Sequence, residues 1–204
     1  MNSLSNGHSG ATYSQALLAI ENGASHVTHL FNQMTGLHHR DPGIVGAAFL
    51  NPNLMAEIIV DGIHVSPEMV DLTYKQITDE RMILITDSMR EKWLKNGEYD
   101  LGGQMVTVKD GKALLDKDTL AGSVLKMKDA FKNIQKFADC DIKSAIKMAS
   151  KNPAKQLNIF DRKGSIALGK DADIVVLDKQ MEVYMTLCKG KFAYKKEEDS
   201  YEDY

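Results

Sequence analysis

The stretch MAEIIVDGIHVSPEMVDLTYKQITDERMILITDSM, residues 55–89, decides the fold of this chain. It contains two apolar runs, Met55–Val60 and Met82–Thr86, each with the length and composition of a buried strand. Between them, Ser66 is suited to a helix N-cap and Pro67 to the first helical position, and apolar residues follow at helical spacing. Strand, helix, strand is the order typical of a parallel α/β sheet, open or closed into a barrel.

The sequence on both sides of this stretch continues the alternation. Thr12–Gly23 has a helical apolar face and ends in glycine, and Ser25–Leu30 is a short β-prone run. Glycine and charged residues over Glu91–Asp118, with an Asp-Gly pair between two short runs, predict a hairpin inserted at the rim of the sheet. Helical patterns return at Ser123–Ala138 and Ile142–Leu157.

The C-terminal part of the chain has a different pattern. Residues 158–194 contain short β-prone runs separated by glycines, which predicts a small separate β layer. Residues 195–204 are charged and weakly hydrophobic, as in a frayed tail. We therefore expect three parts, with boundaries after residues 157 and 194.

Composition narrows the class of function. The chain of 204 residues is 43% hydrophobic and carries a formal net charge of -3, so a core is expected and nucleic-acid binding has no electrostatic support. No apolar run approaches the roughly 20 residues that span a bilayer, so we expect no membrane partner. Cys140 and Cys188 lack CxxC spacing, which favours free buried thiols in a reducing cytoplasm. Small-molecule chemistry in the cytoplasm is the expectation.

The histidines are clustered in the first third of the chain, and all six precede residue 65. His29, His64 and Asp87 lie at or just after the ends of predicted strands, where functional residues of parallel α/β folds collect. His8, before the first helix, adds a third imidazole. Imidazoles bind zinc or iron, and a carboxylate beside a metal-bound water can take its proton. The pattern favours metal-assisted hydrolysis.

Each of these residues also has a purely structural interpretation. A histidine at a strand end is more often hydrogen-bonded within the fold than bound to a metal. His26 lies at odd spacing from His29, so it is expected to point to the other side and to be structural. His38 and His39 lie in a polar loop, where a solvated role and a functional role fit the sequence equally well. Asp87 is also suited to cap a following helix.

Six short motifs succeed one another along the chain, and these are GHSGAT (7–12), THLFNQM (28–34), HHRDPG (38–43), VDGIHV (60–65), ITDSM (85–89) and LAGS (120–123). In this order and spacing they resemble the N-acetylglucosamine-6-phosphate deacetylase family of the amidohydrolase superfamily, from Gly7 to about Tyr194. The later KNPAKQLNI and GSIALGKDADIVVLD resemble the segment where amidohydrolases leave the barrel and enter a small β-sandwich.

The resemblance implies a partial barrel fold and an incomplete metal site. Residues 1–157 would be the C-terminal portion of a TIM-like (β/α)8 barrel, and residues 158–194 part of a small β-sandwich domain. A whole barrel takes about 250 residues, and the family's upstream HxH motif and metal-binding glutamate have no counterpart here. We therefore expect an incomplete metal site, and weak or no activity unless another chain complements this one.

The resemblance also implies roles for particular residues. His8 and His29 map onto metal ligands for a divalent ion, zinc, iron or manganese, and Asp87 maps onto the catalytic acid/base. Arg40 maps onto a phosphate-binding arginine that acts in the partner subunit's site of a homodimer. The residues implied in binding an amino-sugar phosphate are Asn32, Gln33, Arg40, His64, Leu120 and Ala121.

The reaction implied is hydrolysis of the N-acetyl group of N-acetylglucosamine 6-phosphate to glucosamine 6-phosphate and acetate. One alternative is another amidohydrolase acting on a different amide, although THLFNQM and HHRDPG resemble a phosphate-sugar site. The second is a non-catalytic half-barrel that binds the sugar phosphate, and it predicts binding that does not depend on metal.

Overall fold

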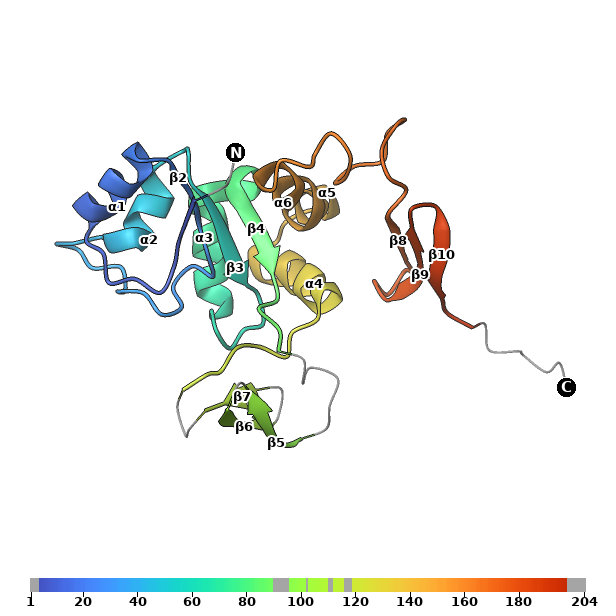
Figure 1. Cartoon of the computed structure of the whole chain (residues 1–204), viewed down its shortest axis with the longest axis horizontal. Coiled ribbons are helices and arrows are strands. Elements are labelled where there is room, and N and C mark those ends of the chain that lie inside the picture. The colour runs from blue at the N-terminus through green and yellow to red at the C-terminus, as the bar shows by residue number, and fades with distance from the viewer. Residues whose placement is uncertain (1–3, 90–95, 102, 110–111, 116–118, 198–204) are drawn as a thin grey trace, which may run out of the picture.

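A four-stranded parallel sheet forms the centre of the molecule (Figure 1). The computed structural model describes residues 4–89, 96–101, 103–109, 112–115 and 119–197. The strands lie in the order β1-β2-β3-β4, with bounds Leu4–Asn6, Ala24–Val27, Met55–Ile59 and Met82–Ile85. They are joined in turn by α1 (Tyr13–Glu21), α2 (Gly43–Leu50) and α3 (Pro67–Arg81). The parallel α/β order predicted from residues 55–89 is confirmed.

Strand β3 carries apolar side chains on both faces, with Glu57 as the exception, because both faces are covered. Ala56 and Ile58 have no exposed surface and belong to the main core, together with Val70 and Ile77 of α3. Ile59, on the opposite face, is also fully buried and packs in a second cluster around α4. This double burial explains why the sequence shows a continuous apolar run instead of an alternating one.

A small antiparallel sheet is inserted beyond the carboxyl ends of β3 and β4 (Figure 1). It consists of β5 (Gly97–Leu101), β6 (Gln104–Lys109) and β7 (Lys112–Leu114), in the order β5-β6-β7. The predicted hairpin is therefore present, with a third strand added. The Asp-Gly pair at 110–111 lies outside the described residues, as do 90–95, 102 and 116–118.

Helical structure resumes later than the sequence predicted. Helix α4 spans Met127–Ala138, and Ser123 instead donates its backbone N–H to the Asp87 carbonyl oxygen at 2.9 Å. That pairing with the end of β4 holds residue 123 in extended backbone, so the helix cannot begin there. The next predicted helix is present as α5 (Ile142–Ile146), a π-helical turn (Lys147–Lys151) and α6 (Asn152–Gln156).

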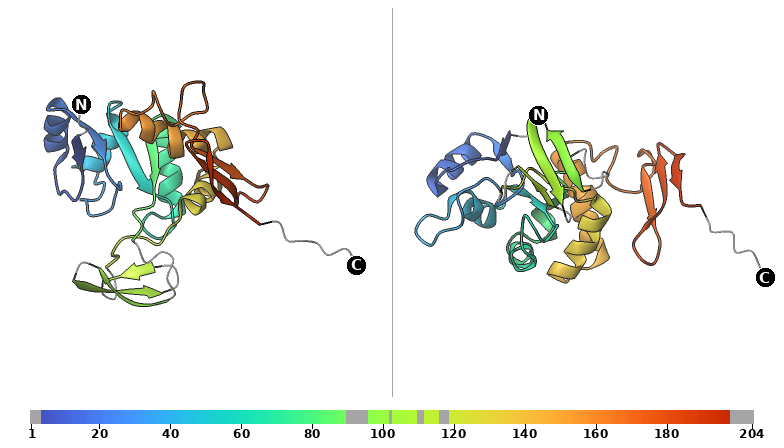
Figure 2. Two further views of the ribbon diagram at one scale, coloured as in Figure 1. Left: turned by 45° about the vertical axis from the view of Figure 1, so that its right-hand side comes forward. Right: turned by 90° about the horizontal axis from the view of Figure 1, so that it is seen from below.

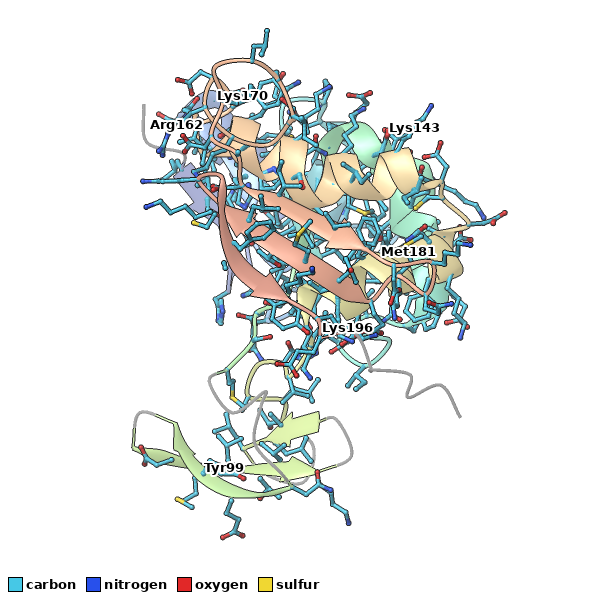
Figure 3. All side chains as sticks on the ribbon, turned by 90° about the vertical axis from the view of Figure 1, so that its right-hand side faces the viewer. Tyr99, Lys143, Arg162, Lys170, Met181 and Lys196 are labelled. Atoms are coloured by element: carbon cyan, nitrogen blue, oxygen red, sulfur yellow. The ribbon has the colours of Figure 1, made fainter. Side chains whose placement is uncertain are left out.

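A third sheet lies to one side of the α/β part, away from the inserted sheet (Figure 2). It is antiparallel, in the order β10-β9-β8, with bounds Lys191–Lys195, Val183–Cys188 and Ile174–Leu177. No residue from 158 to 197 is buried. Figure 3 shows the broad face of this sheet with its side chains. The Glu182 carboxylate accepts hydrogen bonds from Lys128 and Lys132 of α4 and so links this part of the chain to that helix.

The two cysteines differ in their surroundings. Both are free, and Cys140 is buried, but Cys188 at the end of β9 is exposed, so the prediction of two buried thiols is wrong for Cys188. The third sheet has no core in which a side chain can be enclosed. Among the described residues, none of the helices combines the length and the apolar character needed to cross a membrane.

Candidate active site

The carboxyl ends of the four parallel strands carry one candidate side chain each. His8 follows β1, His29 follows β2, His64 follows β3 and Asp87 follows β4. His8, His29 and Asp87 have φ angles of 47°, 28° and 46°, in the left-handed region that non-glycine residues rarely adopt. Backbone of this kind clusters at functional sites, because the surrounding structure must hold it in place.

His8 and His29 are in direct contact. Their Nε2 atoms lie 2.9 Å apart, with the rings edge to face and the centroids separated by 4.7 Å. Two Nε2 atoms bound to one tetrahedral zinc, each at about 2.0–2.1 Å, would be roughly 3.3 Å apart. The pair therefore fits a metal ion as two converging imidazole ligands. Within the described ranges, no group of three or more histidine, cysteine, aspartate or glutamate side chains completes such a site.

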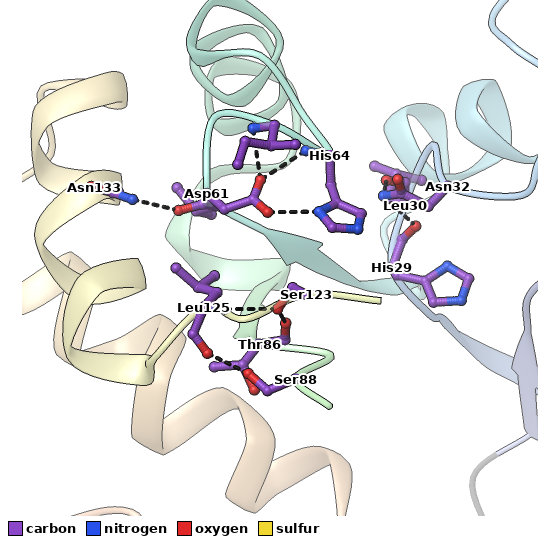
Figure 4. Close-up of polar contacts among 12 residues, drawn as sticks. His29, Leu30, Asn32, Asp61, His64, Thr86, Ser88, Ser123, Leu125 and Asn133 are labelled. Carbon is purple, nitrogen blue, oxygen red and sulfur yellow. Dashed lines mark hydrogen bonds and ion pairs between the residues drawn. The ribbon is translucent and has the colours of Figure 1, made fainter. Parts of the chain in front are cut away.

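His64 is held by Asp61, a residue that the sequence analysis did not single out. The Asp61 carboxylate accepts a hydrogen bond from His64 Nδ1 at 2.6 Å and from the backbone N–H groups of Ile63 and His64 at 2.8 Å each. Because Nδ1 is occupied, Nε2 of His64 is the ring nitrogen free to meet a ligand. Figure 4 shows the His64 ring directed to the side on which His29 lies.

The environment of Asp61 keeps its carboxyl ionised. Burial alone would raise its pKa, but the hydrogen bonds from the His64 ring and from the backbone N–H groups of Ile63 and His64 outweigh burial and lower the pKa. The signal in the sequence was the spacing of Asp61 three residues before His64 in VDGIH. Such a loop lets one carboxylate cap backbone N–H groups and orient an imidazole at once.

The LAGS segment is paired with the end of β4. Besides the Ser123 N–H to Asp87 bond, the Met89 N–H donates to the Ser123 carbonyl oxygen at 3.0 Å. The Ser123 hydroxyl donates to the Thr86 carbonyl oxygen, and the Ser88 hydroxyl donates to that of Leu125 (Figure 4). These bonds bring two segments that lie more than thirty residues apart in sequence to the same edge of the pocket.

Gly122 allows the two segments to approach closely. Its φ is 100°, and a Cβ atom there would lie 3.3 Å from the Asp87 carbonyl oxygen and 3.2 Å from Met89 Cγ. Ser88 and Met89 are not helical, so Asp87 is not a helix cap. Its carboxylate side chain is instead placed at the wall of the pocket.

A pocket of about 860 Å³ opens at this rim. Its lining comprises His8, His29, Asn32, Gln33, His64, Asp87, Ser88, Met89, Leu115, Thr119, Leu120, Ala121 and Gly122. Of the nine candidate residues taken from the sequence, eight are in this lining and Arg40 is not. The volume is in the range of small-molecule sites.

Arg40 lies in an exposed loop away from the pocket. Its Nη1 is 2.7 Å from His39 Nε2, and the loop is closed by a β-bridge between His38 and Asp41. Asp41 in turn accepts the backbone N–H of Tyr13 at 3.0 Å, which ties the loop to the start of α1. The guanidinium therefore faces outward from its own chain's site.

Polar contacts also join β3 to the segment that leads into His29. His26 Nε2 lies 2.9 Å from Glu57 Oε1 of β3, in keeping with a structural role for His26. Burial would raise the pKa of Glu57, but hydrogen bonds from His26 and Thr28, the attraction of His26 and a backbone bond from His29 lower it.

Comparison with known proteins gives the class. The model of the amidohydrolase family matches residues 3–193, and the chain belongs to this family. N-acetylglucosamine-6-phosphate deacetylase of Bacillus subtilis (strain 168) is 45% identical over 188 residues, which are 92% of this chain and 48% of that protein. The chain thus spans about half the length of the curated relatives it matches.

Solved structures extend the likeness to the fold. The crystal structure of N-acetylglucosamine-6-phosphate deacetylase from Thermotoga maritima superposes with a TM-score of 0.92 at 40% identity, covering 95% of this chain and 53% of that one. A mutant of the Mycobacterium smegmatis enzyme in complex with N-acetyl-D-glucosamine-6-phosphate gives a TM-score of 0.89 at 33% identity, covering 93% and 51%.

Proposed function

We propose that this chain carries the rim residues of a metal-dependent deacetylase that hydrolyses N-acetylglucosamine 6-phosphate to glucosamine 6-phosphate and acetate. The observation that carries the proposal is the pocket in which His8, His29, His64 and Asp87, one from the end of each parallel strand, line one space. The names of the relatives at 45% and 40% identity support the substrate class.

The fold is proposed to be part of a larger architecture. Residues 1–157 would be the C-terminal portion of a TIM-like barrel, and residues 158–194 part of a small β-sandwich, followed by a tail at 195–204. Two features support this division: the match covers about half of the Thermotoga chain, and the β8–β10 sheet has no buried residue of its own.

His8 and His29 would hold a divalent metal ion, zinc, iron or manganese, through their Nε2 atoms. When bound, such an ion would lower the pKa of a coordinated water towards neutrality and polarise a carbonyl group. The Asp87 carboxylate removes a proton from the attacking water. It then returns that proton to the leaving amine as the amide C–N bond breaks, so that acetate and the free amino sugar are the products.

The remaining lining residues bind and orient the substrate. His64, fixed by Asp61, offers Nε2 to the sugar or to the scissile carbonyl. Asn32 and Gln33 lie along the sugar phosphate, and the Asn32 amide is oriented by bonds to the carbonyls of His29 and Leu30 at 3.3 Å each. Leu120 and Ala121 supply an apolar wall opposite the polar groups.

Arg40 is assigned to the phosphate in the site of a partner subunit, which requires a homodimer. The support is its position in an exposed loop, outside the pocket of its own chain. A planar guanidinium binds two phosphate oxygens at once, so Arg40→Ala should raise the Michaelis constant more than it lowers turnover. An unchanged Michaelis constant would remove this role.

The experiment that tests the proposal uses the natural protein, isolated with an antibody against the tail KKEEDSYEDY, with its intact mass measured against the 22.7 kDa of this chain. Acetate release from N-acetylglucosamine 6-phosphate is expected, with loss on chelation and a fall of about 10²–10⁴-fold in Asp87→Asn. Unphosphorylated N-acetylglucosamine is the control substrate.

Two other outcomes would each select one of the alternatives. Amine release from an acyl-amino acid, with none from the sugar phosphate, would identify an amidohydrolase for a different amide. Binding of glucosamine 6-phosphate that is equal with and without chelator, without any acetate release, would identify a non-catalytic binding protein.

A further inference from the structure

Glu57 is a partly buried acidic residue that the proposed reaction does not use. It lies in the middle of β3, one strand away from His29, on the face opposite to the main core. Its Oε1 lies 2.9 Å from His26 Nε2, and its Oε2 accepts the Thr28 hydroxyl at 2.6 Å. Both partners belong to the segment that leads into His29.

The backbone around His29 is bound to the same residue. The Leu30 N–H donates to the Glu57 carbonyl oxygen at 2.8 Å, and the His29 backbone N–H contributes to lowering the pKa of the Glu57 carboxyl. His29 has a φ of 28°, which is an unfavourable conformation for a residue with a side chain. A backbone held in this way needs neighbours that fix it, and Glu57 contacts the residues on both sides of the strained position.

Thr28 extends these contacts to the strand that carries His8. A Cβ atom on Gly7 would lie only 2.2 Å from Thr28 Cγ2, so the threonine methyl group occupies the space beside Gly7. The Thr28 N–H also donates to the Asn6 carbonyl oxygen at 2.9 Å. Because the hydroxyl of Thr28 is bound to Glu57, its methyl group is held against the backbone immediately before His8.

We propose that Glu57 is a positioning residue for the histidine pair: through Thr28 and the backbone of His29 it sets the distance between the His8 and His29 imidazoles. The carboxylate contacts neither ring and acts only through the three strands that it joins. This inference rests on the proposed role of His8 and His29 as metal ligands.

The test compares variants that remove the hydrogen bonds with variants that keep them. Glu57→Gln keeps the size of the side chain but presents an amide N–H₂ to groups that are themselves donors. Thr28→Val keeps the methyl contact with Gly7 and removes only the hydroxyl, whereas Thr28→Ser keeps the hydroxyl. Asn152→Ala is the matched control, since it removes a buried side-chain clamp to Asp79 and Met82 far from the site.

Two measurements are made on the full chain. Without metal, the nuclear Overhauser effect between the ring protons of His8 and His29 reports their proximity, and competition with a chromophoric chelator gives the affinity for Zn²⁺. We expect Glu57→Gln to lose the ring contact and to bind Zn²⁺ about 10–100-fold more weakly, and Thr28→Val to shift both in the same direction. Thr28→Ser should resemble the unmodified chain. Asn152→Ala should lower the melting temperature and leave both readouts unchanged.

An unchanged ring contact and Zn²⁺ affinity in both Glu57→Gln and Thr28→Val would overturn the proposal. If Glu57→Gln does not fold, Thr28→Val decides the question alone. Zn²⁺ binding that persists in His8→Ala and His29→Ala would contradict the proposed ligand role, and the metal-free ring contact would still report whether Glu57 positions the pair.

Discussion

The parallel β1–β4 sheet and the antiparallel β8–β10 sheet differ in how deeply their side chains are buried. The strands of the parallel sheet contribute fully buried side chains such as Val27 and Ile58, packed beneath α1, α2 and α3. The β8–β10 sheet has no fully buried residue: Leu177 and the neighbouring Met181 pack, partly buried, against the main core, and Glu182 adds ion pairs to Lys128 and Lys132 of α4. Hydrophobic burial dominates folding, whereas exposed ion pairs contribute little.

This difference bears on where the chemistry is placed. The candidate side chains follow strands whose positions are fixed by close packing, so their distances can be set within tenths of an ångström. A sheet without an enclosed core gives no such precision. The contrast leads to four predictions, which compare the same kind of change in the two regions.

The largest effect is expected from a deletion in the core. Ile58→Ala should lower the free energy of unfolding by about 2–5 kcal/mol, because Ile58 is fully buried and a cavity would remain. Val175→Ala in β8, where the side chain is 57% exposed, should change it by less than about 0.5 kcal/mol. Urea denaturation of both variants measures the two values, and equal losses would show that the β8–β10 sheet has a core of its own in solution.

The two cysteines should differ in reactivity. Burial, with the nearby charge of Asp141, raises the pKa of the Cys140 thiol from 9.0 to about 11, whereas Cys188 is exposed. A rise of two units lowers the thiolate fraction about 100-fold at neutral pH, and burial slows access further. Labelling with a chromogenic disulfide should therefore show one fast and one slow thiol. Cys188→Ser should abolish the fast phase only.

Two aspartates allow the same substitution at the rim and in the outer sheet. Asp61→Asn should lower the proposed deacetylase activity about 10–100-fold, because an amide N–H₂ group would face the His64 Nδ1–H group. Asp173→Asn, next to β8, removes a carboxylate bound to Lys163 and to the Lys189 N–H, and activity should be unchanged. Steady-state kinetics decide between these outcomes, and similar losses in both variants would contradict a role specific to Asp61.

The smallest effect is expected from the ion pairs of Glu182. Hydrogen bonds from Lys128 and Lys132 lower the pKa of Glu182 from 4.5 to about 2. The associated stabilisation is present above pH 4.5 and is lost as the pH falls towards 2. Its side chain is 40% exposed, so solvent screens the interaction. Glu182→Gln should lower the melting temperature slightly at pH 6 and not at pH 2, and a difference that persists at pH 2 would assign the effect to packing.

The sequence predicted strands β2, β3 and β4 and helices α1 and α3, because burial leaves a local pattern there, whereas β1 and α2 were not predicted. The Ser66-Pro67 start of α3 agrees with the structure, although the Ser66 side chain makes no capping hydrogen bond. The start of the helix after LAGS was predicted too early, since the pairing of Ser123 with Ser88 depends on a segment distant in sequence. Cys188 was misjudged for the same reason, because its exposure depends on what packs against β9.

The sequence predicted most of the residues that line the candidate pocket, but not the residues that hold them in place through hydrogen bonds. Eight of the nine candidate residues line the pocket, because each lies at or near a strand end or in a motif beside one. Asp61 and Glu57 were missed. Their importance comes from hydrogen bonds across a loop and across neighbouring strands, and no periodicity in the sequence marks such bonds.

The sequence by itself determined the strand–helix–strand order of residues 55–89, the apolar character of β3 and the placement of His29, His64 and Asp87 after successive strands, because hydrophobic runs and strand ends are local features of the chain. The strand that precedes His8 was not predicted. Only the tertiary structure decided that His8 and His29, which are 21 residues apart, approach within 2.9 Å, and that Arg40 lies outside the pocket. These positions depend on strand register and on the close approach of neighbouring segments at Gly7 and Gly122. All of these arise when segments remote in sequence pack together.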